Sequence, residues 1–220
     1  MERHFDEELR ELEEQLLRMG ALVGEMISLS IKALAQRETG LITVVREKED
    51  EVNRLHIKID ELCLRLLALR QPLAVDLRFI TAGLRINSDL ERMGDLAVNI
   101  TDATRPLLEE PPLKPLIDIP RMSEMAANMA KESLNSFLKR DTKLAKAILN
   151  QDNEVDYLKD QIFREFLTYM MQDSSTIKRA LELILISRHL ERIADHACNI
   201  AEDVIFMVMG KDIRHPKLQR

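Results

Sequence analysis

Residues 90–100 read L-E-R-M-G-D-L-A-V-N-I, and residues 190–200 read L-E-R-I-A-D-H-A-C-N-I. Seven of the eleven positions are identical, at an offset of 100 residues. In both stretches the apolar residues fall three or four positions apart, which is the spacing of one buried face of a helix. Two similar segments at a fixed offset indicate an internal repeat. The chain is therefore expected to contain two copies of one helical unit.

The similarity extends towards the N-terminal side of this motif in both copies. Residues 37–41 resemble residues 140–144, and residues 51–53 resemble residues 154–156, both at an offset of 103. The second copy is thus three residues shorter between these segments and the motif, since the offset falls from 103 to 100. A duplicated fold tolerates such a length change in a connector.

Helical spacing of apolar residues predicts three helices in each copy. They cover roughly residues 7–37, 41–69 and 74–104 in the first copy, and 120–139, 142–171 and 175–209 in the second. Thr39 and Thr142 stand where N-caps are expected. Because short connectors join antiparallel neighbours, the predicted fold class is all-α, with two tandem three-helix bundles.

A proline-rich stretch separates the two copies. Five of the seven prolines lie between Arg105 and Arg121. Proline lacks a backbone donor and disfavours helix in the residue before it, so this stretch is expected to be a linker. The predicted domains are a first bundle over residues 1–105, the linker over 106–120 and a second bundle over 121–220.

The composition indicates a soluble protein of the reducing cytoplasm. Among 220 residues, 45% are hydrophobic, 32% are charged with both signs mixed, and the net charge is −6. No basic run suggests nucleic acid as a partner. No signal-like segment or apolar stretch of ~20 residues occurs, so contact with a membrane is expected only through partners. The two cysteines, Cys63 and Cys198, form no disulfide framework or metal-ligand spacing.

Each copy carries polar side chains four residues apart on two neighbouring helices, and such pairs share one helix face. Within each copy, both pairs lie ~22 Å from the connector that joins their two helices, so they fall at the same height along the bundle. Oxygen ligands gathered in this way suit hard cations such as Mg²⁺ or Mn²⁺, or iron in carboxylate clusters. The predicted divalent-metal ligands are Glu49, Asn53, Glu91 and Asp95 in the first copy, and Asp152, Asp156, Glu191 and Asp195 in the second.

A second interpretation of these residues stays open. Charged side chains at the edge of a bundle are normally solvated. Arg92 and Arg192 stand three residues before Asp95 and Asp195, and Arg188 stands three residues before Glu191, so each arginine could pair with an acidic neighbour. His189 and His196 flank the second motif, but the first copy has Asp89 and Leu96 there. Both histidines are therefore interpreted as exposed helix residues.

The repeated E-R-[MI]-x-D-x-A-x-N-I motif resembles the signature of the PhoU family, regulators of bacterial phosphate transport. Residues 71–78, Q-P-L-A-V-D-L-R, resemble the family at the second connector. The resemblance covers essentially the whole chain. It implies a cytoplasmic negative regulator of phosphate uptake and of the phosphate-starvation response. The implied partners are the ATPase of the phosphate ABC transporter and a sensor histidine kinase.

The resemblance also implies a metal. Some members of the PhoU family bind multinuclear iron or other divalent metals through E/D-x-x-x-D motifs. Glu91 with Asp95 matches this motif, as do the corresponding pair in the second copy and the pair of Asp152 with Asp156. Asn53 departs from the motif because its amide is neutral, so the first-copy site is expected to bind more weakly or to hold fewer ions.

The sequence is compatible with three functions. A non-catalytic regulator is favoured because the sequence holds no Gly-rich phosphate loop and no G-x-S-x-G nucleophile motif, so no catalytic residue is predicted. The alternative is a carboxylate-bundle protein that binds or stores iron, or a di-iron enzyme, but the inward-facing Glu-x-x-His pairs of that class are missing. A scaffold with solvated carboxylates is the third. A homodimer is expected.

Overall fold

The computed structural model describes residues 2–214, with side chains from residue 5, and this part contains six α-helices and no strand. The all-α prediction and the three helices per copy are confirmed. Residues 1 and 215–220 of the predicted domains lie outside the described residues. The helices are α1 (Glu2–Gln36), α2 (Gly40–Arg70), α3 (Ala74–Leu108), α4 (Asp118–Lys139), α5 (Thr142–Gln172) and α6 (Ile177–Met209), with a 3₁₀ turn at Ser174–Thr176.

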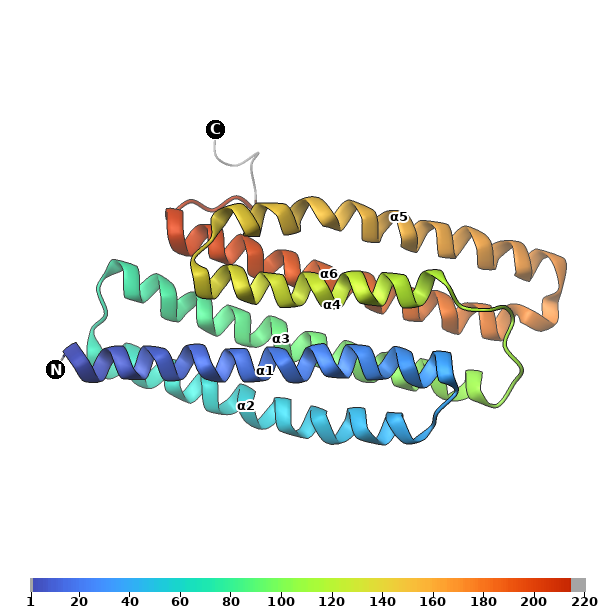
Figure 1. Cartoon of the computed structure of the whole chain (residues 1–220), viewed down its shortest axis with the longest axis horizontal. Helices are drawn as coiled ribbons and strands as arrows, with labels where there is room; N and C mark the ends of the chain where they lie inside the picture. Colours follow the sequence, from blue (N-terminus) through green and yellow to red (C-terminus); the bar gives the residue numbers. More distant parts are fainter. Residues whose placement is uncertain (1, 215–220) are drawn as a thin grey trace.

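Figure 1 shows the six helices running antiparallel along one long axis. Helices α1, α2 and α3 pack on one another, and α4, α5 and α6 do the same. The two units also lie side by side, with α3 against α6 and α1 against α4. Within the described chain, no helix has an apolar run long enough to cross a membrane.

The buried residues of all six helices form one continuous hydrophobic core. The repeated motif supplies its centre, since Leu90, Met93 and Ile100 of α3 are completely buried, as are Leu190 and Ile193 of α6. Such spacing gives each motif helix a wide apolar face. The two predicted bundles thus share one core.

A close approach of α1 to α4 depends on a glycine. A Cβ atom added to Gly20 would overlap the Cδ1 atom of Leu134 on α4, whereas one added to Gly24 would meet nothing within 4 Å. Gly20 therefore permits contact between the two copies, and Gly24 has no such role.

The linker is shorter than predicted, because only residues 109–117 separate α3 from α4. Pro106 lies inside the last turn of α3 without ending it. Pro120 lies in the first turn of α4, where a backbone N–H has no helical partner in any case. The predicted linker of residues 106–120 was thus too long at both ends.

Two arginines, one from each copy, hold the linker. The Arg37 guanidinium donates to the carbonyl oxygens of Leu107, Leu108 and Glu110 at 3.2, 2.7 and 2.8 Å. Arg179 Nη1 donates to the carbonyl oxygen of Pro111 at 2.9 Å. These bonds satisfy carbonyl groups that the end of α3 leaves without a helical donor.

The helix caps differ in part from the prediction. Asp141 caps α5, because its carboxylate accepts from the backbone N–H groups of Lys143 and Leu144, and Thr142 is the first helical residue. Thr39 precedes α2 but makes no side-chain cap hydrogen bond. A carboxylate one residue earlier is the better acceptor for the free N–H groups of a helix start.

Candidate functional site

Four predicted ligands of the second copy lie on the neighbouring helices α5 and α6, and we call them the second-copy patch: Asp152, Asp156, Glu191 and Asp195. Burial and the charge of Asp156 raise the pKa of Asp152. Partial burial and the charge of Glu191 raise the pKa of Asp195 to about 6, and Asp152 and Asp156 contribute to the same shift. The charges of these side chains thus act on one another across the packed helices α5 and α6.

A lysine bridges the two helices of the second-copy patch. Lys159 Nζ lies 2.9 Å from Asp156 Oδ1 and 3.2 Å from Glu191 Oε1, and donates to both. The hydrogen bond to Asp156 is the main cause of a raised pKa of Lys159, so the amine is an ammonium ion at neutral pH. Charge-assisted bonds of this kind are stronger than neutral ones. The patch thus contains its own cation.

A thiol borders the second-copy patch. The Cys198 side chain of α6 lies beside the Asp152 carboxylate of α5. Burial is the main cause of a raised pKa of the Cys198 thiol, and the charge of Asp152 adds to it, so the thiol keeps its proton at neutral pH.

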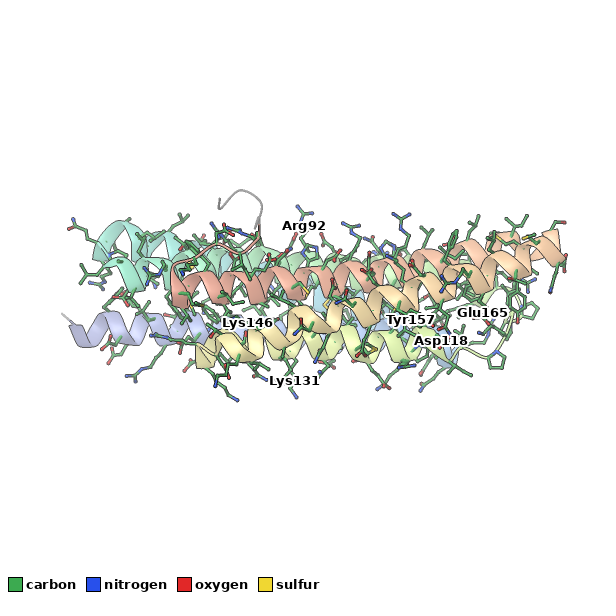
Figure 2. All side chains as sticks on the ribbon, turned by 90° about the horizontal axis from the view of Figure 1, so that it is seen from above. Arg92, Asp118, Lys131, Lys146, Tyr157 and Glu165 are labelled. Atoms are coloured by element: carbon green, nitrogen blue, oxygen red, sulfur yellow. The ribbon has the colours of Figure 1, made fainter. Side chains whose placement is uncertain are left out.

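The first-copy patch consists of Glu49, Asn53, Glu91 and Asp95. Burial and the charge of Asp95 raise the pKa of Glu49, so these two carboxyl groups of α2 and α3 lie near each other. Asn53 is exposed on α2. Arg92 is within 3.6 Å of Glu91 and 3.8 Å of Asp95, yet its side chain is 65% exposed and projects from the molecule (Figure 2). Such loose surface pairs contribute little to stability.

The eight predicted ligands do not lie in the arrangement that a metal ion needs. Their oxygen chemistry suits a hard cation. Over residues 5–214, however, no group of three or more His, Cys, Asp or Glu side chains lies close enough to hold a metal. In the second copy the ammonium of Lys159 lies between Asp156 and Glu191. As they lie, the side chains do not form a coordination site, and metal binding stays a prediction.

Sequence reasoning missed Lys159, and the available signal was its spacing of three residues from Asp156 on one helix face. It also misjudged His196, whose Nδ1 lies 2.8 Å from Asp89 Oδ1 and joins α6 to α3 across the two copies. His189 is half-buried, and burial lowers the pKa of its imidazole. The prediction of two exposed histidines was therefore wrong.

The fold and the two patches define a class of protein: a duplicated helical bundle in which each copy presents a polar patch on its last two helices. The family model described as the PhoU domain matches the chain twice, over residues 16–104 and 119–204. Because these matches cover most of the chain, it belongs to the PhoU family. The resemblance seen in the repeated motif is confirmed.

Similar proteins cover nearly the whole chain. A phosphate-specific transport system accessory protein PhoU homolog of Aquifex aeolicus is 43% identical over 212 residues, which is 96% of each chain. A homolog of the same description from Pseudomonas aeruginosa is 39% identical over 98% of this chain and 90% of its own.

Two solved structures share the fold. The crystal structure of PhoU from Pseudomonas aeruginosa matches with a TM-score of 0.90 and 38% identity, over 94% of this chain and 100% of that one. The phosphate transport system regulatory protein PhoU from Streptococcus pneumoniae matches with a TM-score of 0.86 and 30% identity, over 95% and 99%. Close agreement over the full length supports the same order of helices in all three.

Proposed function

We propose that the protein is an accessory regulator of phosphate-specific transport and acts by binding other proteins. The observation that carries this proposal is the 43% identity, over 96% of both chains, to a protein described as a phosphate-specific transport system accessory protein. In this proposal the chain works in the cytoplasm without catalysis. It represses phosphate uptake and the starvation response by contacting the transporter's ATPase and a sensor histidine kinase.

Exposed apolar side chains support a role in protein contacts. They lie on α5 and α6, each between 41% and 48% exposed, and are Phe163, Leu167, Leu181 and Leu185. The equivalent positions of the first copy hold Asp60, Leu64, Thr81 and Arg85. Grouped apolar residues on a surface are typical of interaction sites, and they also support the homodimer that we propose.

A protein that stores iron is the weaker alternative. Such a protein needs carboxylates that are open to the metal, as in the inward-facing ligands of ferritin-like bundles. In the second copy, two of the predicted ligands, Asp156 and Glu191, are already bound to Lys159. The regulator that we propose needs no metal to neutralise this patch.

The proposal is tested by affinity purification of the tagged chain from phosphate-replete native cells, followed by mass spectrometry. We expect the wild type to recover the phosphate-transporter ATPase or a sensor kinase. The double variant Phe163→Ser, Leu181→Ser should recover at least about tenfold less, because it breaks the apolar group. Ile57→Ser, a change at an apolar residue of α2 that is 59% exposed, is the matched control.

Two further measurements accompany this experiment. Size-exclusion chromatography with light scattering should give the mass of two chains for the purified wild type. Deletion of the gene should switch on phosphate-starvation genes in replete medium. The regulator proposal fails if folded, saturating bait recovers neither partner and the deletion leaves those genes silent.

A further inference from the structure

The two copies differ at the position of Lys159. At the offset of 103 that relates α2 to α5, the first copy has His56 in its place. His56 does not bridge two helices through its ring, because its Nε2 atom lies 3.7 Å from Asp60 on the same helix, four residues away. An ammonium ion between two patch carboxylates is therefore a feature of the second copy.

Three carboxylates surround the Lys159 ammonium. Besides the bonds to Asp156 and Glu191, its Nζ atom lies 3.9 Å from Asp160 Oδ1. The side chain is 26% exposed, so most of its surface is in contact with protein. Ammonium and divalent cations bind the same carboxylate oxygens, and both cannot occupy one position.

We propose that Lys159 is the resident cation of the second-copy patch, holding between α5 and α6 the place that a divalent ion would take. The second copy is then stable without metal, and a divalent ion binds there only after displacing the ammonium from Asp156 and Glu191. This reverses the order expected from the sequence, in which the first-copy site was the weaker one. The inference does not rest on the regulatory role.

The consequence of removing the lysine follows from the charges that remain. Without Lys159, four carboxylates face one another with no internal cation, and groups of like charge in a partly buried place destabilise the fold. A divalent ion would then supply the missing charge through the same oxygens. The stability of such a variant should depend on metal, whereas that of the wild type should not.

The test compares Lys159→Met with the wild type, each in a Glu49→Gln, Asp95→Asn background that leaves the first-copy patch with a single carboxylate, Glu91. Melting temperatures are measured in EDTA and in Mn²⁺, and Mn²⁺ binding by equilibrium dialysis. We expect Lys159→Met to melt lower in EDTA, to recover in Mn²⁺ and to bind Mn²⁺ at least about tenfold more tightly than the wild type. The wild type should melt at the same temperature in both solutions.

Two controls separate the proposal from general effects of losing a charge. Lys159→Arg keeps the cation and should remain insensitive to metal. Lys48→Met breaks a comparable bridge between α2 and α1, in which Lys48 Nζ lies 2.8 Å from Glu25 Oε2, and should melt lower without responding to Mn²⁺. If Lys159→Met does not fold, Lys159→His, which installs the residue of the first copy, takes its place.

The proposal is overturned by either of two results. One is that Lys159→Met, or its replacement, gains neither Mn²⁺ affinity nor a melting response to the ion. The other is that the protein with Lys159 intact, in the same background, already binds Mn²⁺ as tightly as the variant, and that adding Asp195→Asn to it abolishes this binding. Because purified protein is measured, failure of the regulatory proposal in cells would change neither result.

Discussion

The Asp195 carboxyl group is held in an environment that disfavours its charge. Partial burial and Glu191 raise its pKa to about 6, above the value of 3.8 for a free side chain. The folded protein therefore binds more protons than the unfolded chain between these two pH values, and the free energy of unfolding falls as the pH rises through this window. Above pH 6 the penalty is complete, and below about pH 3.8 it is absent.

We therefore predict that Asp195→Asn is more stable than the wild type at pH 7.5, by about 1 kcal/mol after allowance for solvent screening of this exposed group. That gain corresponds to a melting temperature about 2–4 °C higher. The difference should shrink steadily as the pH is lowered to 4. Thermal unfolding followed by circular dichroism at several pH values measures it, and a difference independent of pH would contradict the assigned cause.

Residue types and their spacing were enough to select the carboxylates of the second-copy patch, but not the group that neutralises them. Asp156 and Glu191 could be aligned because their distances from the connector are fixed by helix geometry. Lys159 has a long, flexible side chain that can reach several acidic neighbours, and the carboxylates that it binds depend on how α5 and α6 are packed.

At the scale of the helix, two glycines of α1 permit a matched comparison. Gly24→Ala adds a methyl group to open space and improves helix propensity, so we expect it to stabilise the protein by about 0.5–1 kcal/mol. Gly20→Ala gains the same propensity but displaces the buried Leu134 side chain. It should be less stable than Gly24→Ala by about 1–3 kcal/mol.

Chemical denaturation of the two alanine variants measures this difference. The double variant Gly20→Ala, Leu134→Ala is the control, since it removes the displaced side chain and should reduce the cost specific to Gly20. Equal stability of the two single variants would show that α1 and α4 are not in close contact at Gly20.

Helix number and order could be predicted because apolar spacing persists through long stretches, but the helix ends could not. Pro106 was expected to end α3, yet the helix continues to Leu108. The carbonyl groups beyond this proline are bonded by Arg37, which is distant in the sequence. A contact over some seventy residues leaves no local signal at the proline.

At the scale of the whole molecule, the shared core predicts how the protein unfolds. Since α3 packs on α6 and α1 on α4, neither copy can open without exposing apolar surface of the other. We expect one cooperative transition, with a calorimetric enthalpy equal to the van't Hoff enthalpy. Differential scanning calorimetry tests this, and two separate transitions, each assignable to one copy, would contradict it.

The packing between the two copies could not be predicted from the sequence. Periodicity identifies a buried face of a helix but not the helix that covers it. His196 illustrates this, because its partner Asp89 is 107 residues away and belongs to the other copy. The shape of the repeat was predictable, whereas the contacts that unite two repeats depend on surfaces that meet only in the folded chain.

An odd number of antiparallel helices in each copy has a geometric consequence. The first copy ends at the opposite end of the molecule from where it began, so the second runs back and its helices point the other way (Figure 1). The two copies are thus arranged like the two subunits of a dimer, related by an approximate twofold axis that runs across the length of the molecule. A partner with its own twofold symmetry would meet equivalent surfaces twice, distinguished by a histidine on one and a lysine on the other.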